Sequence, residues 1–259
     1  MQEKKIANIK TVFKQFSIRL CRCENFYVHL LPINNPIKYT QMKRNILLSL
    51  TLMVALSAVV SMPVKAQKTI DLFNGFNLDG WGFVLRDDSK KPEEVYKVQN
   101  GVIHITGSPF GYMYTLNKYD NYRLHVEWRW PQEATNSGIF LFVQDDNKVW
   151  PNAVECQLQA GNAGDFVLLN GSNLAEFVTK KGEARPAFPV VKKKNASSEM
   201  AVGEWNNADI TCEKGAITVY INGVLQNKGT KSLHKTGHIA LQSEGKDIQF
   251  RNVRLTPLK

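Results

Sequence analysis

A short run of polar side chains around Glu155 has the residue types and the spacing needed to act on a sugar. Glu155, Gln157 and Gln159 occupy alternate positions, and the residues between them are apolar. Successive side chains on a strand point to opposite faces, so this spacing predicts one carboxylate and two amides on a single face. Such groups supply the acceptors and donors that bind hydroxyl groups, and a carboxylate can also remove a proton.

Two further segments show the same alternation of polar and apolar side chains. The polar positions are Arg123, His125, Glu127 and Arg129 in residues 122–130, and His238, Gln242 and Glu244 in residues 238–244. We expect the polar faces of all three strands to lie on a shared side and to bind a carbohydrate. The alternative is an ordinary solvent face that is held together by ion pairs between neighbouring strands.

Residues in the connecting segments extend this candidate site. Trp150 precedes Pro151 just before the strand of Glu155, where an indole could stack on a sugar ring or could instead anchor the core. Asn136 and Gly138 lie between two predicted strands. The glycine either lets the backbone approach a ligand or serves a plain turn.

The elements that position these residues are short strands, because no segment after residue 67 keeps a helical period for three turns. Strands are predicted over residues 95–98, 102–106, 122–130, 138–143, 153–159, 209–213, 217–221, 238–242 and 248–255. Asn100-Gly101 and Asn222-Gly223 are typical of hairpin turns. This pattern predicts one all-β domain over residues 67–259, a β-sandwich of the jelly-roll type.

Residues 170–198 form a long stretch with few strand signals. Pro186, Pro189 and the run Lys192-Lys193-Lys194 lie within it. A loop of this length in a compact domain is often functional. The three lysines favour a solvated surface over a phosphate or nucleic-acid site.

The net charge of +10 does not indicate a nucleic-acid partner, because most of it lies near the N-terminus. Residues 1–66 contain 10 Lys and Arg against 2 Asp and Glu, whereas residues 67–259 contain 23 against 21. The predicted domain is therefore almost neutral. The composition, with 43% hydrophobic and 22% charged residues, also excludes a mainly disordered chain.

Residues 42–66 have the three parts of a secretory signal. Met42-Lys43-Arg44 is basic, residues 46–60 carry no charge, and Val64-Lys65-Ala66 fits a cleavage site before Gln67. A membrane anchor is the alternative, but the run is short for a span of about 20 residues. We therefore expect a periplasmic or secreted protein with no membrane span after cleavage. Residues 1–41 would be an upstream mis-translated or unstructured extension, or else a long basic leader.

The four cysteines of the chain do not have the spacing of a metal-binding motif. Cys21 and Cys23 have no nearby His or Cys partner, so a zinc site is not predicted there. Cys156 and Cys212 follow the expected cleavage point. An exported protein could pair them, and two buried free thiols fit their apolar surroundings equally well.

Several short motifs along residues 67–259 are specific in combination. They are Leu72–Trp81 (LFNGFNLDGW), Asn136–Ile139 (NSGI), Trp150-Pro151, Val154–Leu158 (VECQL), Gly161–Asp165 (GNAGD), Gly203–Asn206 (GEWN), Leu241–Gly245 (LQSEG) and Phe250–Val253 (FRNV). Over about residues 69–257 the chain resembles the 3-keto-disaccharide hydrolase family, also described as 3-keto-glucoside 1,2-lyases and 3-keto-2-hydroxy-glucal hydratases. The resemblance implies a concanavalin A-like jelly roll and an enzyme that acts on glycosides oxidised at C3, which the signal-like segment would export.

The implied reaction needs one base. A ketone at C3 acidifies the proton at C2, so a base can remove that proton, and the C1 substituent then leaves by elimination. Water can add back to complete net hydrolysis. Glu155 is the candidate base, with Gln157 and Glu244 as further catalytic candidates. The candidates for substrate binding are Glu127, Arg129, Asn136, Trp150, Asp165, His238 and Gln242.

The sequence offers several candidates for the group that would stabilise the enolate. Gln157, Arg129 or His238 could bind the enolate oxygen, and a divalent metal could do so instead. Glu127, Glu155 and His238 could be ligands of such a metal, although no ligand spacing indicates one. Some family members have a His where this chain has Ser243 or Glu244. If that His is catalytic, this chain either uses Glu244 instead or acts on another substrate.

Three other functions fit parts of the sequence. A non-catalytic carbohydrate-binding module would use the same fold and the same aromatic and amide groups. A structural domain of the cell envelope would bind no ligand. A glycosidase with two carboxylates is disfavoured, because the strand of Glu155 carries one carboxylate where that mechanism needs a pair.

Overall fold

The computed structural model describes residues 67–145 and 148–258, and nearly all of its regular structure is strand. One short helix, α3 (Pro92–Val95), lies among these residues, and none of them forms a helix that is long and apolar enough to cross a bilayer. The prediction of an all-β jelly-roll sandwich is confirmed. The expected signal sequence, the segment before it and the pair Cys21 and Cys23 lie outside the described residues.

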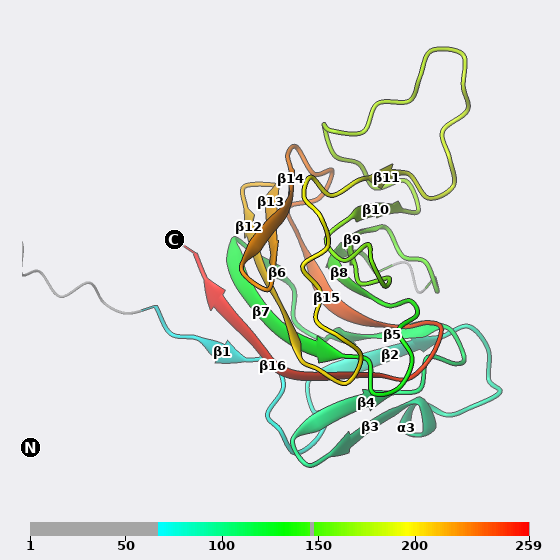
Figure 1. Ribbon diagram of the computed structural model, residues 1–259, viewed down its shortest axis with the longest axis vertical. Helices are drawn as coiled ribbons and strands as arrows, with labels where there is room; N and C mark the ends of the chain where they lie inside the picture. The colour runs from blue at the N-terminus through cyan, green and yellow to red at the C-terminus, as the bar shows by residue number, and fades with distance from the viewer. Residues whose placement is uncertain (1–66, 146–147, 259) are drawn as a thin grey trace, which may run out of the picture. The chain divides into compact units, whose positions relative to one another are not determined.

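Two sheets make up the sandwich (Figure 1). The first sheet contains, in order, β14 (Val224–Gly229), β13 (Ala216–Ile221), β12 (Asn206–Glu213), β7 (Tyr122–Arg129), β16 (Ile248–Pro257), β4 (Val102–Ile105) and β3 (Tyr96–Gln99), with β1 (Ile70–Asp71) beside β16. The second sheet contains β11 (Val190–Val191), β10 (Phe166–Leu169), β9 (Ala153–Gln157), β8 (Gly138–Val143), β15 (Thr236–Ser243), β5 (Gly111–Thr115) and β2 (Trp81–Leu85), with β6 (Tyr119–Asp120) beside β15.

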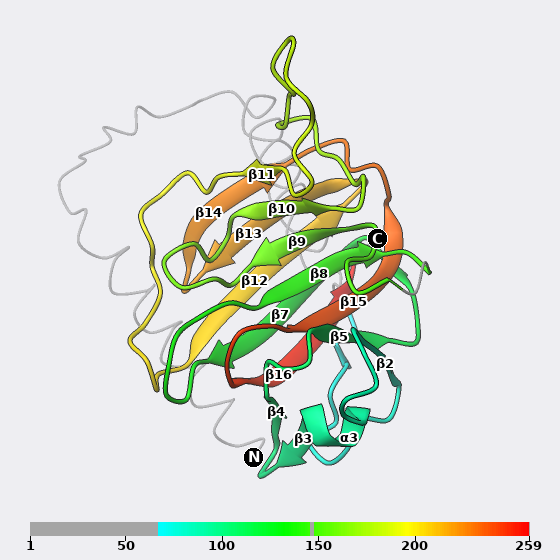
Figure 2. The same ribbon diagram turned by 90° about the vertical axis from the view of Figure 1, so that its right-hand side faces the viewer.

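The hydrophobic core lies between the two sheets, which Figure 2 shows one in front of the other. Val126 and Trp128 of the first sheet and Val154, Cys156 and Leu241 of the second are buried there. These are the apolar positions of the alternating strands, so their polar neighbours must point to the two outer faces. Cys156 and the equally buried Cys212 are free thiols. Of the two alternatives left open by the sequence, a disulfide or two buried thiols, the structure shows the second.

The predicted strands all correspond to observed ones, and both hairpins are confirmed. Asn100-Gly101 joins β3 to β4, and Asn222-Gly223 joins β13 to β14. All four turn residues have positive φ, the geometry that a two-residue hairpin with right-handed twist requires. Several short strands were not predicted, among them β10, whose four apolar residues Phe166–Leu169 are too few to show a period.

Candidate functional site

A cleft of about 250 Å³ opens on the outer face of the second sheet. Its lining residues are Asn136, Trp150, Glu155, Gln157, Val167, Leu169, Phe188, Val190 and Glu244. Five of the ten residues proposed from the sequence are therefore together, namely Asn136, Trp150, Glu155, Gln157 and Glu244. They come from separate parts of the chain and meet because β8, β9 and β15 are neighbours in this sheet.

Glu155 lies in the middle strand of this surface and faces the cleft. Its neighbours in β9, Val154 and Cys156, point into the core, so the alternation of the strand turns Glu155 outward. It pairs with Phe140 of β8 on one side and with Val167 of β10 on the other. The side chain is only 3% exposed, yet it lines an open cleft and does not lie in the layer between the sheets.

Gly138 makes room for the Glu155 carboxyl group. A Cβ atom at this position would lie 2.2 Å from Oε1 of Glu155, far closer than any van der Waals contact. Gly138 is the first residue of β8 and does not have positive φ, so it forms no turn of the kind considered from the sequence. Its missing side chain serves the carboxylate that lies over it.

The surroundings of the Glu155 carboxyl group disfavour its ionised form. Its Oε1 has no hydrogen-bond partner among the described residues. Burial raises the pKa of Glu155 well above its ordinary value, and the negative charge of nearby Glu244 raises it further. An unpaired carboxyl group in a largely apolar setting costs stability, and such groups concentrate at functional sites.

Glu244 and Asn136 form the second half of the cleft's polar lining. Burial raises the pKa of Glu244, while the neighbouring amides of Asn136 and Gln242 act in the opposite direction. Neither Oε1 nor Nε2 of the buried Gln242 has a hydrogen-bond partner within the described part of the chain. Gln242 is 1% exposed and does not line the cleft, whereas Asn136 does.

The side chain of Gln157 is oriented by the backbone of the two residues that follow it. Its Oε1 accepts hydrogen bonds from the N–H groups of Leu158 and Gln159, each at 3.1 Å. Because the oxygen is occupied in this way, the NH₂ group is the part of the side chain that remains for a ligand in the cleft. The amide therefore acts as a fixed donor.

The expectation that three polar strand faces share one side is wrong for β7, and it places Glu127 and Arg129 incorrectly. β7 belongs to the first sheet, so these side chains lie on the opposite outer face from Glu155. Glu127 accepts hydrogen bonds from Arg251 and Asn252, both at 2.6 Å, and Arg129 donates to Gln249 at 2.6 Å. Alternation tells which residues of a strand share a face, but not which sheet the strand joins.

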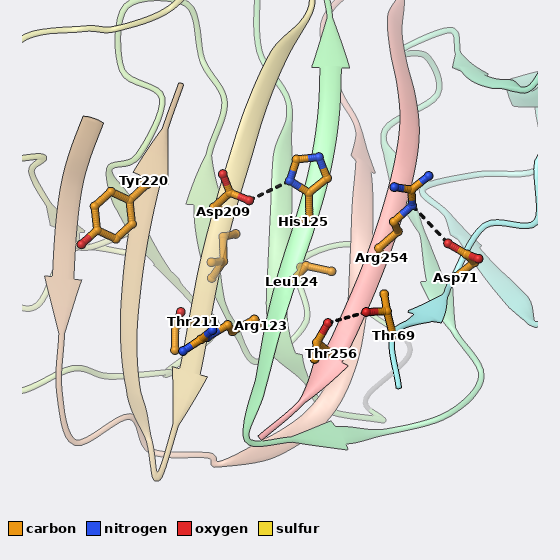
Figure 3. A pocket seen from close by; sticks show the side chains of 11 residues that line it. Thr69, Asp71, Arg123, Leu124, His125, Asp209, Thr211, Tyr220, Arg254 and Thr256 are labelled. Carbon is orange, nitrogen blue, oxygen red and sulfur yellow. Dashed lines mark hydrogen bonds and ion pairs between the residues drawn. The ribbon is translucent and has the colours of Figure 1, made fainter. Parts of the chain in front are cut away.

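A larger hollow, with a volume of about 770 Å³, lies on that opposite face (Figure 3). Two ion pairs form among the side chains that line it. His125 lies 2.7 Å from Asp209, and Arg254 lies 3.2 Å from Asp71. This face is the ordinary ion-paired surface that was the alternative interpretation of the polar pattern.

His238 lies on the same outer face as Glu155 but in a separate small hollow. Its Nδ1 is 2.6 Å from the carbonyl oxygen of Thr115, and its Nε2 is 2.6 Å from Oδ1 of Asp145. Both ring nitrogens are thus occupied. With Glu127 in the other sheet, the set Glu127, Glu155 and His238 cannot hold one metal, and no cluster of three or more potential ligands is present in the described residues.

Asp165 also has partners within the protein. Its carboxylate is 2% exposed, accepts a hydrogen bond from the backbone N–H of Lys193 at 2.7 Å and forms an ion pair with Lys192 at 2.9 Å. Asp165 therefore fastens the end of the long loop to the sheet. It does not line the cleft.

Four cleft residues were not predicted from the sequence: Val167, Leu169, Phe188 and Val190. The first two belong to the unpredicted strand β10, and Val190 begins the two-residue strand β11. Phe188 lies in the long segment 170–198, which its length alone marked as functional. No signal in the sequence distinguishes this phenylalanine from its neighbours.

A jelly-roll sandwich with a carboxyl-lined cleft on one sheet places the chain among carbohydrate-active proteins of the glycoside-hydrolase kind. The 3-keto-alpha-glucoside-1,2-lyase-like domain family matches residues 68–256. The chain belongs to this family, a hydrolase-type enzyme family, and the resemblance found in its motifs is confirmed.

One related protein and two similar solved structures complete the comparison, and the two structures show a shared fold. A 3-keto-disaccharide hydrolase of Bacteroides thetaiotaomicron is 24% identical over 250 residues, which cover 77% of this chain and 81% of the relative. The crystal structure of a candidate glycosyl hydrolase from Parabacteroides distasonis is similar with a TM-score of 0.53, 20% identity and coverage of 74% and 94% of the two chains. The carbohydrate-binding module CBM66 of Bacillus subtilis shares the fold at a TM-score of 0.50, 9% identity and 68% and 95% coverage.

Proposed function

We propose that the chain cleaves glycosides whose sugar ring carries a ketone at C3, and that Glu155 removes the proton at C2. The observation that carries this proposal is the buried carboxyl group of Glu155, a residue that lines the cleft and whose Oε1 has no partner in the described structure. The name of the Bacteroides thetaiotaomicron relative, a 3-keto-disaccharide hydrolase, supports the substrate class.

The proposed reaction proceeds by elimination and then addition. Glu155 takes the C2 proton, and the electron pair of that C–H bond moves toward the C3 oxygen to give an enolate. The enolate reforms the ketone, C1 and C2 become doubly bonded, and the C1–O bond breaks with its electrons on the leaving oxygen, which takes a proton. Water then adds its oxygen to C1 while C2 regains a proton, and the product is the free 3-keto sugar.

The environment of Glu155 suits a base for a carbon acid. A proton next to a ketone is weakly acidic, and general-base catalysis becomes more effective as the pKa of the base rises, provided that the base is ionised. Burial and the charge of Glu244 raise the pKa of Glu155 in this direction. Glu244 is the second carboxyl group of the cleft, and burial raises its pKa as well.

The amides of the cleft would stabilise the enolate. The fixed NH₂ group of Gln157 is a donor in a cleft that also contains the amide of Asn136. Donors that are oriented before the reaction stabilise developing negative charge without reorganisation. Trp150 would provide a flat surface for the sugar ring.

The proposal is tested by incubating the protein with 3-keto-trehalose and following the products by NMR. We expect release of glucose together with the 2-hydroxy-enone or the free 3-keto sugar. Substrate that stays intact under conditions in which the protein is folded would contradict the proposal.

A second candidate function is favoured by one observation. The cleft contains two carboxyl groups, Glu155 and Glu244, and an ordinary glycosidase uses such a pair as acid and nucleophile or base. This enzyme would hydrolyse unoxidised trehalose or other unoxidised glucosides. The enzyme that we propose in first place would leave them intact.

We further propose that the protein acts in the periplasm or outside the cell. The support is the order of basic, apolar and small residues over 42–66. N-terminal sequencing of the protein recovered from cells should find a first residue near Gln67, and an intact N-terminus would contradict the proposal.

A further inference from the structure

A second cavity, of about 320 Å³, lies directly beside the cleft. Its lining residues are Lys148, Val149, Trp150, Asn170, Ala187 and Phe188. Trp150 and Phe188 line both cavities, so these two aromatic side chains separate the second cavity from the cleft of Glu155.

The two aromatic rings are held edge to face. Their centroids are 5.8 Å apart at an interplanar angle of 73°, and Trp150 has a similar contact with Phe110 at 6.3 Å. Phe188 remains 46% exposed in spite of these contacts. A large aromatic side chain that is fixed by packing but open to solvent beside a cleft is suited to stack on the apolar face of a ligand.

The backbone ties Phe188 to the strand of Glu155. The carbonyl oxygen of Pro189, the next residue, accepts a hydrogen bond from the N–H of Leu168 in β10 at 2.8 Å. Val190 then pairs with Val167, which pairs with Glu155. The wall between the cavities therefore has a fixed position relative to the proposed base, although it belongs to a long loop.

We infer that the second cavity is the subsite for the leaving group and that it takes a second sugar ring. The inference rests on the proposed function, because the oxidised ring must occupy the cleft at Glu155. A glycosidic bond joins two adjacent rings, and here two adjacent cavities share an aromatic wall. Lys148 and Asn170 add polar groups to the lining, which suits a ring with one apolar face and a hydroxyl edge.

Ala187 offers a way to fill the second cavity alone. It is exposed and lines this cavity but not the cleft. The substitution Ala187→Trp should lower kcat/KM for 3-keto-trehalose by roughly threefold to tenfold, the range expected when one aromatic stacking contact is lost. Methyl 3-keto-α-glucoside, whose leaving group is too small to fill the cavity, should be cleaved as before.

Ala184 provides the matched control. It is exposed, lies in the same loop and lines neither cavity. Ala184→Trp should leave both substrates unaffected. An Ala187→Trp variant that cleaves both substrates normally, or that loses both to the same degree, would overturn the inference.

A binding measurement separates this inference from the catalytic proposal. Calorimetry on the Glu155→Gln variant, where turnover plays no part, should show tighter binding of 3-keto-trehalose than of methyl 3-keto-α-glucoside. Adding Ala187→Trp should remove that difference. Equal binding of the two ligands before Ala187→Trp is added would overturn the subsite, whereas failure of the wild-type protein to cleave either ligand would overturn the proposed reaction alone.

Discussion

The two outer faces of the sandwich carry similar polar residues and use them in opposite ways. On the first sheet, Glu127 is held by Arg251 and Asn252, and His125 lies against Asp209. On the second sheet, Glu155 is more deeply buried and yet has an oxygen with no partner in the described structure. A carboxylate with partners stabilises a fold, whereas one that is buried without partners destabilises it, so its presence indicates a function.

The largest expected difference between the two faces is in activity. Glu155→Gln and Glu127→Gln are the same change in size and charge. Because Glu155 is the proposed base, its replacement should lower kcat on a 3-keto glucoside by about 10²-fold to 10⁴-fold. Glu127→Gln should leave kcat near the wild-type value. Steady-state kinetics on both variants measures this, and equal losses would remove the distinction between the faces.

The next effect concerns the space that Gly138 leaves for Glu155. In Gly138→Ala the added methyl group would displace the carboxyl oxygen that now lies over the glycine. Misplacing a catalytic group by about 1 Å can cost about 10²-fold in rate, so we expect a loss of that order in kcat. Circular dichroism should show that the sheets are retained. A fully active Gly138→Ala variant would contradict the placement of Glu155 as the base.

The pH dependence should report the interaction between the two carboxyl groups of the cleft. The base must be ionised, so kcat/KM falls as the pH drops through the pKa of Glu155, which is above the ordinary glutamate value of 4.5. Glu244→Gln removes the negative charge that helps to raise this pKa. The acid limb of the pH profile should therefore move to lower pH. A limb that stays in place would show that Glu244 does not act on Glu155.

The smallest expected effect is on stability, and its sign should differ between the faces. The raised pKa of Glu155 means that the folded state holds this proton more tightly than the unfolded chain, so stability falls as the pH rises from about 4.5 through the raised value. Glu155→Gln removes this loss and should raise Tm most at alkaline pH.

Glu127 should behave in the opposite way. Burial acts to raise its pKa, but hydrogen bonds from Arg251 and Asn252 hold the pKa below its ordinary value. Its ionised form therefore adds stability above the ordinary pKa, and this is lost as the pH falls through the lowered one. Glu127→Gln should cost about 1 kcal/mol at neutral pH. Thermal melts across the pH range test both variants, and shifts of the same sign would contradict the contrast.

The sequence predicts local geometry better than it predicts which strands meet. Alternation correctly turns Glu155 and Gln157 away from the core, and the Asn-Gly pairs correctly mark two hairpins. The same alternation cannot show that β7 joins the other sheet, because strand partners are chosen by contacts distant in sequence. For that reason the pattern grouped Glu127 with Glu155.

Other parts of the site depend on contacts that leave no local signal. The role of Gly138 appears only when β9 pairs with β8 and brings Glu155 over it. Phe188 reaches the cleft because Pro189 is bound to Leu168 of β10, a strand too short to be predicted. The motifs correctly indicated the family, and the folded structure was needed to separate the residues of the cleft from those of the opposite face.

The origin of the C2 hydrogen in the product tests the central claim most directly. The protein is incubated with 3-keto-trehalose in D₂O, and the 3-keto sugar is examined by NMR before it exchanges without enzyme. If Glu155 removes the C2 proton, the product should carry deuterium at C2, and Glu155→Gln should give neither cleavage nor exchange. Cleavage that leaves the original hydrogen at C2 throughout would show displacement at C1 and would contradict the account.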